Sequence, residues 1–169
     1  MMKRHFLMAL CALLAAATAM AQSNRLIIQD FEIAPDSTVT IPVTLVNEDI
    51  SRGMQFNLTV PEGLTIEDMR VTKCSKSLGM SLTYSDKSDT KIIVLYQMGK
   101  SCFPPDSADV ALIEFRAAHD FKGGELSVWK GRGSTMDNDP FIIEGDTAVV
   151  AVPAASLILI NPTEEQYYK

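Results

Sequence analysis

Two neighbouring stretches of the chain, 38–46 and 53–60, alternate strictly between apolar and polar side chains. A period of two is the pattern of a β-strand that buries one face and exposes the other to water. A polar link at 47–52 joins the stretches, and Pro-Glu-Gly at 61–63 has the composition of a turn. We therefore predict a pair of half-buried strands whose inward side chains are Val39, Ile41, Val43, Leu45, Met54, Phe56, Leu58 and Val60.

Short strand patterns separated by turns continue to about residue 152. Beyond the opening pair, strands are expected at 26–33, 64–72, 80–85, 91–98, 110–117, 125–131 and 141–152. No segment carries a long helical period, and Gly, Pro, Asp and Asn occupy the joints. About nine such strands predict an all-β fold, an antiparallel β-sandwich or barrel. Pro42 cannot donate to a strand ladder, so we expect an edge or a bulge there.

The stretch 91–98 (KIIVLYQM) differs from its neighbours because almost every position is apolar. One interpretation is a central strand with both faces covered by the core. The other is a strand that exposes Ile93 and Leu95 as an apolar strip for a partner. The pattern favours burial and leaves exposure as the alternative.

The first 21 residues have the pattern of a secretory signal. Lys3 and Arg4 form a basic start, 6–17 is an apolar run, and Ala-Met-Ala at 19–21 resembles a cleavage site. The apolar run is shorter than the roughly 20 residues that a membrane span needs. We therefore expect an extracellular or periplasmic protein that begins at residue 22.

Neither end of the chain predicts membrane attachment. Cys11 follows Leu10, whereas a lipoprotein signal has a small residue at that place, so we expect no lipid anchor. Near the other end, a second apolar run covers 148–160. Pro153 and Ser156 interrupt this run, and no basic flank follows it. For 154–169 we expect a last strand on the sheet or an acidic tail.

Residues 22–153 have the length of a single domain with one core. Loss of the signal would remove two of the 15 basic residues and leave 13 against 21 acidic ones, a net charge of −8. Nucleic acids and anionic membranes are recognised by basic surfaces. An acidic domain therefore argues against both as partners.

Two cysteines, Cys74 and Cys102, remain after the predicted cleavage. Secreted proteins fold in an oxidising environment, so we predict a disulfide bond between them, tying two loops together. Such a bond would contribute on the order of 3–4 kcal/mol by restricting the unfolded chain. Two free thiols or a metal site are the alternatives.

Residues for catalysis are sparse. His119 is the one histidine beyond the predicted signal, and it lies in a polar turn where solvation is its ordinary state. The sequence has no HExxH, GxSxG, P-loop or CxxC motif. Residues 136–141 (MDNDPF) gather acidic side chains as calcium loops do, but their spacing fails the EF-hand pattern and favours a turn. We predict a non-enzymatic protein without a cofactor or metal.

The order of these segments resembles that of a cohesin domain, particularly the single-copy cohesin-like proteins of Bacteroidales. The likeness covers 26–152 and rests on Ile41-Pro42-Val43 in the second strand, on the third strand ending in Pro-Glu-Gly-Leu at 61–64, and on the late strand at 113–117. It implies a nine-stranded jelly-roll sandwich, in the superfamily that also contains carbohydrate-binding modules of families two and three.

Cohesins bind dockerins, small calcium-dependent modules, through one sheet face that includes the third, fifth, sixth and eighth strands. Carried onto this chain, the resemblance implies that the partner-binding residues are Gln55, Asn57, Thr59, Ser81, Thr83, Gln97, Ser127 and Trp129. The outward parity of most of them comes from the alternation itself, whereas their binding role comes only from the resemblance. Trp129 is either an outward anchor or a covered core residue.

Three functions are therefore compared. The first is a secreted binding module for a protein partner in a polysaccharide-degrading or surface assembly. The specific form of this hypothesis is a partner that carries a dockerin. Because this sequence has no dockerin-like DxNxDG segment, the dockerin would act in trans. The second is a carbohydrate-binding module, and the third is a structural or adhesive envelope protein. A sugar platform usually needs several aromatic rings, and the sequence supplies few, so protein binding is preferred.

Overall fold

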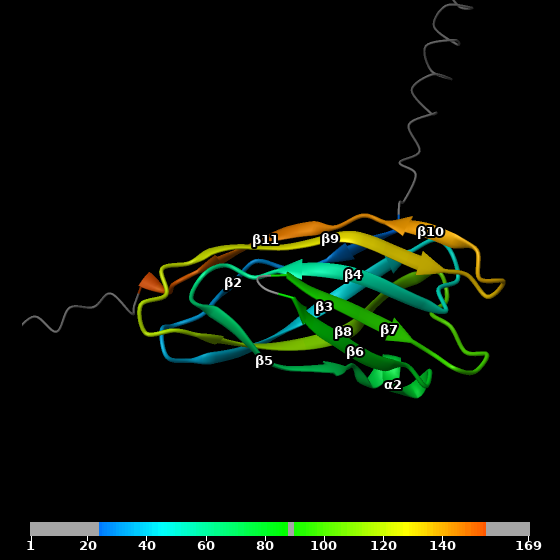
Figure 1. The fold of residues 1–169 in the computed structure, drawn as a ribbon, viewed down its shortest axis with the longest axis horizontal. Helices are drawn as coiled ribbons and strands as arrows, with labels where there is room; N and C mark the ends of the chain where they lie inside the picture. Colours follow the sequence, from blue (N-terminus) through cyan, green and yellow to red (C-terminus); the bar gives the residue numbers. More distant parts are fainter. Residues whose placement is uncertain (1–23, 88–89, 155–169) are drawn as a thin grey trace, which may run out of the picture.

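The structure is a computed structural model that describes residues 24–87 and 90–154. Within these residues eleven strands and one α-helix follow one another along the chain (Figure 1). They are β1 (Arg25–Ile27), β2 (Phe31–Glu32), β3 (Thr38–Asn47), β4 (Gly53–Thr59), β5 (Leu64–Val71), α2 (Lys73–Ser77), β6 (Ser81–Lys87), β7 (Thr90–Tyr96), β8 (Asp106–Ala117), β9 (Gly124–Ser134), β10 (Pro140–Ile143) and β11 (Asp146–Ala151).

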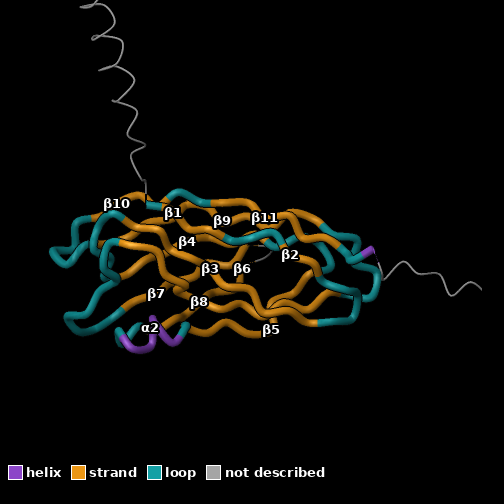
Figure 2. Tube along the Cα trace, turned by 180° about the vertical axis from the view of Figure 1, so that it is seen from behind, coloured by secondary structure: helices purple, strands orange, loops and turns teal. Residues whose placement is uncertain are grey.

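The strands form two sheets that pack face to face. One has four strands in the order β1-β3-β8-β5, and the other has seven, in the order β2-β11-β9-β4-β7-β6 with β10 also paired to β9. Every ladder is antiparallel except that between β2 and β11. In Figures 1 and 2 the sheets lie as two layers of a sandwich. The fold is the predicted all-β sandwich with jelly-roll topology.

Two of the nine predicted strands each divide into two. The predicted strand at 26–33 becomes β1 in the four-stranded sheet and β2 in the seven-stranded sheet. Ile28 lies between them and is fully buried, so the apolar pattern continues while the chain crosses from sheet to sheet. The predicted strand at 141–152 becomes β10 and β11. A Cβ atom on Gly145, between these two strands, would lie 1.9 Å from the Val128 carbonyl oxygen, so only glycine fits.

The alternation predicted for the opening pair is present in β3 and β4. In β4, Met54, Phe56 and Leu58 are buried, and in β3 the inward positions Ile41, Val43 and Leu45 are buried as well. Pro42 lies beyond the end of β1, which pairs only with 44–46, and a register shift follows at Val43/Thr44. Both expected features of the proline position, a local edge and a bulge, are therefore confirmed.

Strand β7 lies inside the seven-stranded sheet between β4 and β6. Ile93 and Leu95 are fully buried, which confirms burial and excludes their exposure as an apolar strip. The opposite face of β7 is not covered by another layer, because Ile92 and Val94 are half-buried and Tyr96 is exposed. The apolar residues on the outer side of this strand are therefore the even-numbered ones.

Helix α2 connects the two sheets, running from the end of β5 toward β6, and the strand pattern did not predict it. The Thr72 side chain caps its start by accepting a hydrogen bond from the Ser75 amide at 3.2 Å. Ser75 is fully buried, and its hydroxyl donates to the Val110 carbonyl oxygen at 2.6 Å. This hydrogen bond fixes the helix against β8 (Figure 2).

Replacing Ser75 by alanine is expected to lower the free energy of unfolding by about 1–2 kcal/mol. The variant removes a buried donor and leaves the Val110 carbonyl oxygen with a weaker partner. Ser77→Ala is the matched control, because the Ser77 hydroxyl donates to the Cys74 carbonyl at the exposed side of the same helix. Urea denaturation of both variants tests this prediction, and equal losses would contradict it.

Cys74 and Cys102 are free thiols, so the predicted disulfide bond is absent and that prediction is wrong. Cys74 lies on α2 rather than in a loop, and the helix turns Ser75 inward while Cys74 stays exposed. Cys102 precedes Phe103, which an isolated bridge ties to Ser51. The segment of Cys74 is therefore held by α2, and the segment of Cys102 is held by the bridge to Ser51. Neither segment depends on a covalent link to the other.

An exposed ion pair joins two loops at one end of the sandwich. The Nδ1 atom of His119 lies 2.6 Å from a carboxylate oxygen of Asp36. The hydrogen bond and the negative charge of Asp36 raise the pKa of His119 above its ordinary value of 6.5. Asp36 has a positive φ of 59°, which asparagine tolerates as well as aspartate does.

This pair predicts a pH-dependent stability difference between the wild type and Asp36→Asn. Because the pKa of His119 is raised in the folded state, the stabilisation is fully present below pH 6.5 and is lost as pH rises through the raised pKa. The Tm of the wild type should therefore exceed the Tm of the variant by a larger margin at pH 5.5 than at pH 8.5. An NMR titration should also find a lower His119 pKa in the variant, and an unchanged pKa would contradict the pairing.

The stretch 136–141 begins with the predicted turn, at 136–137, and its last two residues, Pro140 and Phe141, already belong to β10. The Thr135 hydroxyl accepts a hydrogen bond from the Asp139 amide at 3.1 Å, and Asn138 adopts a positive φ of 67°. Among the residues that the structure describes, no group of three or more His, Cys, Asp or Glu side chains is placed to hold a metal ion.

Candidate functional site

The strands that the sequence grouped as a binding face lie next to one another. The predicted third, fifth, sixth and eighth strands correspond to β4, β6, β7 and β9, and they are contiguous in the order β9-β4-β7-β6. Strand pairing places seven of the eight predicted residues on the side facing away from the core, here called the outer face: Gln55, Asn57, Thr59, Ser81, Thr83, Ser127 and Trp129.

Directly paired residues share a face, so the register defines rows across this surface. One row runs from Thr83 through Val94, Gln55 and Arg132 to Ile142. A second row contains Ser85, Ile92, Asn57 and Trp129. A third contains Thr90, Thr59, Ser127 and Thr147. The polar side chains of β4 therefore lie beside apolar side chains of β7 in the first two rows, whereas the third row is polar throughout.

Trp129 is an outer-face residue and not part of the core. It is 36% exposed, and its indole nitrogen donates to the Thr59 hydroxyl at 3.0 Å. The Lys130 ammonium lies 4.7 Å from the centre of the ring, a cation–π contact. A register shift in β9 opposite Gln55 and Asn57, with Lys130 at a φ of 52°, gives Trp129 this position. The ring is therefore held in place before any partner binds.

Gln97 does not belong to the outer face, and its predicted placement is wrong. Strand β7 ends at Tyr96, and Gln97 has the parity of the buried Leu95 rather than that of the outward Tyr96. Its side-chain nitrogen donates to the Leu78 carbonyl beyond α2, at 3.3 Å. Its side-chain oxygen is buried and has no hydrogen-bond partner. Gln97 therefore helps to hold α2 instead of facing solvent.

Sequence reasoning missed the apolar members of the outer face. Tyr96 is 41% exposed and pairs with Ser81, while Ile142 is 78% exposed and pairs with Arg132. Ile92 and Val94 lie on β7, on the same face as Tyr96. The alternation along β7 could have identified Ile92 and Val94 as outward residues. Ile142 lies on β10, and the pairing of β10 with β9 cannot be deduced from alternation. Together these residues give the outer face exposed apolar area.

The opposite surface of the sandwich, the outer side of the four-stranded sheet, has a different chemistry. Arg70 contacts Asp68 at 2.7 Å and Glu114 at 3.5 Å, and Arg116 contacts Glu67 at 3.2 Å. No large hydrophobic side chain on the described strands β3, β5 or β8 is among the exposed ones. Arg70 and Arg116 on this surface are therefore paired with carboxylates of the chain, whereas the outer face of the seven-stranded sheet carries exposed apolar groups.

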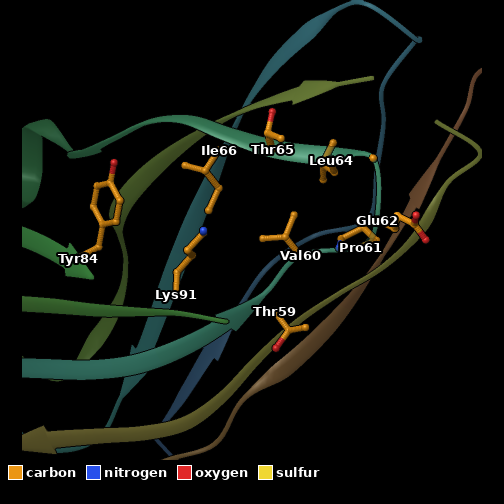
Figure 3. A pocket seen from close by; sticks show the side chains of 10 residues that line it. Thr59, Val60, Pro61, Glu62, Leu64, Thr65, Ile66, Tyr84 and Lys91 are labelled. Carbon is orange, nitrogen blue, oxygen red and sulfur yellow. The ribbon is translucent and has the colours of Figure 1, made fainter. Parts of the chain in front are cut away.

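A groove of about 860 Å³ opens between the edges of the two sheets, beside β5 and β6. In Figure 3, Tyr84 and Lys91 from the seven-stranded sheet face Ile66 of β5, and Glu62 lies at the far end. Val60 and Leu64 give the groove apolar walls. The residues that line it include no histidine, cysteine or serine.

His119 also lies away from the outer face, at the loop that follows β8, where its partner is Asp36. No helix among the described residues is long and apolar enough to cross a membrane. The predicted signal at 1–21 lies outside the described residues, as does the predicted tail at 154–169 apart from its first residue.

These features define a β-sandwich whose distinctive surface is one sheet face. The cohesin domain model matches residues 25–152, and the chain belongs to the cohesin family. Cohesin domains are binding modules, and dockerins are their partners. No curated protein matches the sequence.

Solved cohesin structures share the fold at low sequence identity. The chain is similar to a non-cellulosomal cohesin from Archaeoglobus fulgidus, with 12% identity and a TM-score of 0.61 over 76% of this chain and 91% of that one. It is also similar to a chain of a type I cohesin–dockerin complex from Clostridium thermocellum, with 12% identity and a TM-score of 0.65 over 78% and 99%. The chain is similar as well to the sixth cohesin of scaffoldin B from Acetivibrio cellulolyticus, which was solved with a dockerin. The sequence identity is 17% and the TM-score is 0.61, over 78% of this chain and 99% of that one.

Proposed function

We propose that this chain is a secreted, non-catalytic module that binds a protein partner through the outer face of β9, β4, β7 and β6. The observation that carries the proposal is the contrast between the two outer surfaces. The surface of the four-stranded sheet carries the ion pairs of Arg70 and Arg116 and no exposed large apolar side chain on β3, β5 or β8, whereas the other surface leaves Trp129, Tyr96 and Ile142 exposed beside polar side chains. Exposed apolar and aromatic groups within a polar surround are typical of protein-binding surfaces.

The proposed partner is a protein that carries a dockerin, acting in trans. Membership of the cohesin family supports this assignment, as do the similar cohesins that were solved together with dockerins. The residues proposed to contact the partner are those of the outer face, with Gln55, Asn57 and Thr59 in the central strand β4. Gln97 is not among them.

The proposed setting is an extracellular or surface assembly, which includes the polysaccharide-degrading assemblies of the resemblance. The signal pattern at 1–21 supports secretion. A carbohydrate ligand receives no specific support from the outer face, because Trp129 on β9 and Tyr96 on β7 are separated by the intervening strand β4. Two such rings do not form a continuous stacking platform for a glycan.

A pull-down from the secreted fraction of the source organism tests the proposal. The bait is used as the wild type, as Asn57→Arg and as Thr40→Arg, with and without a calcium chelator, and captured proteins are identified by mass spectrometry. Asn57→Arg places a long cation in the centre of the outer face. Thr40→Arg is the matched control, because Thr40 is exposed on the opposite surface, paired with Glu114.

The expected result is capture of a protein with a dockerin sequence by the wild type and by Thr40→Arg. Asn57→Arg and calcium chelation should each abolish the capture. Capture that is unaffected by Asn57→Arg would refute the outer face as the binding site, and calcium-independent capture would refute the dockerin. Recovery of polysaccharide instead of protein would support the carbohydrate-binding alternative.

A further inference from the structure

We propose that the partner places a carboxylate side chain on Arg132, flanked by aliphatic side chains that contact Val94 and Ile142. This inference rests on the proposed function, because it specifies the chemistry of the partner at the same outer face. It concerns one row of side chains, and it follows from the position of a cation that the chain leaves without a partner.

Arg132 lies on β9, an inner strand of the seven-stranded sheet, where β4 pairs on one side and β10 on the other. Its direct neighbours in the row are Gln55 and Ile142, and Val94 lies beyond Gln55. Arg132 is exposed, and Ile142 beside it is 78% exposed. A cation therefore lies between Gln55 and the exposed Ile142, one strand in from β10, which ends the row.

The charge of Arg132 is not compensated within the described chain. Among residues 24–87 and 90–154, Arg132 takes part in no ion pair and no side-chain hydrogen bond. By contrast, Arg70 and Arg116 on the opposite surface contact three carboxylates, those of Asp68, Glu114 and Glu67. Arg70 and Arg116 on the opposite surface are therefore paired with carboxylates, whereas Arg132 on the proposed binding surface is not.

Docking would remove water from Arg132, because its neighbours Ile142 and Val94 are the groups that a partner covers. An arginine that loses its water without gaining an anion destabilises the complex. The guanidinium fork matches a carboxylate in a bidentate arrangement, and the Gln55 amide beside it offers a further donor. A partner that binds this row must therefore supply an acidic side chain here.

The local charge also orients the partner. Lys130 and Arg132 place two cations at one end of β9, whereas Glu125 lies near the other end of the same strand. The chain as a whole has a net charge of −6. The negative net charge of the chain repels an acidic partner, but Lys130 and Arg132 attract an acidic group locally. These two cations therefore favour the orientation of the partner that places its acidic group opposite Arg132.

The test uses the protein captured by the wild type in the pull-down, purified and titrated by calorimetry against full-length variants. Arg132→Glu should weaken binding at least about 30-fold, and Arg132→Lys by less, because it keeps the charge but loses the fork. Replacing the partner's Asp and Glu residues one at a time by Lys should identify one substitution that restores binding to Arg132→Glu. Circular dichroism confirms that each variant is folded.

The outcomes separate this inference from the proposed function. If Asn57→Arg abolishes binding while Arg132→Glu binds like the wild type, the inference is wrong and the proposed face stands. If Arg132→Glu loses binding but no charge reversal in the partner restores it, the carboxylate assignment is wrong. If neither variant changes the affinity, or if the wild type captures no protein, the inference and the proposed function both fail.

Discussion

Replacing Phe115 by alanine is expected to lower the free energy of unfolding by about 3–5 kcal/mol. Phe115 lies on β8 in the four-stranded sheet and is fully buried. Its ring stacks on that of Phe31 from β2 in the seven-stranded sheet, with centroids 5.7 Å apart and planes 19° apart. The substitution removes a contact between the two sheets and leaves a cavity, and a domain has only about 5–15 kcal/mol to lose.

Leu112→Ala provides the control for this effect on the same strand. Leu112 pairs with Pro42 on the outer side of the four-stranded sheet and is half-buried, so its truncation should cost about 1 kcal/mol or less. Guanidinium denaturation of both variants, fitted with a common dependence of the free energy of unfolding on denaturant concentration, gives both losses of stability. A loss for Phe115→Ala no larger than that for Leu112→Ala would contradict the assignment of Phe115 to the centre of the core.

Replacing Trp129 by alanine is expected to weaken partner binding about 30-fold or more. Large aromatic residues are enriched among those that cost 2 kcal/mol or more when truncated, and this loss corresponds to that factor. The hydrogen bond to Thr59 and the contact with Lys130 hold the ring before binding, so little ordering entropy is lost on docking. Calorimetric titration with the purified partner measures the change.

The Trp129 variant should remain folded, because the ring lies outside the core. Its Tm is expected to change by only a few degrees, since the substitution removes one exposed hydrogen bond and leaves no buried cavity. Leu112→Ala should bind the partner like the wild type, because Leu112 faces away from the proposed site. A Trp129→Ala variant with unchanged affinity would remove Trp129 from the binding surface.

Alternation predicted most of the fold and most of the candidate face, because it reports directly which side of a strand meets water. It placed Asn57 and Thr59 outward and Phe56 and Leu58 inward, as the structure does. It was less informative for 91–98, where apolar residues lie on both sides. There Ile93 and Leu95 are buried, and the outward Ile92 and Val94 were not singled out.

The remaining errors concern contacts between segments that are distant in the sequence. Whether Cys74 and Cys102 meet depends on α2, whose orientation is set by the Ser75 hydroxyl and the Val110 carbonyl oxygen. The division of 26–33 into β1 and β2 depends on two different pairing partners, β3 and β11. Arg132 and Ile142 become neighbours only through the β9–β10 pairing. None of these pairings leaves a local periodicity in the sequence.

Methyl cross-saturation NMR on the complex with the captured partner tests the central claim most directly. Methyl groups of the chain are labelled, and saturation transferred from the partner identifies those in contact. Ile92, Val94 and Ile142 should lose intensity, because they lie on the outer face of the seven-stranded sheet. Intensity losses at Ile27 and Leu112 on the four-stranded sheet, with Ile92, Val94 and Ile142 unchanged, would contradict the proposed binding face.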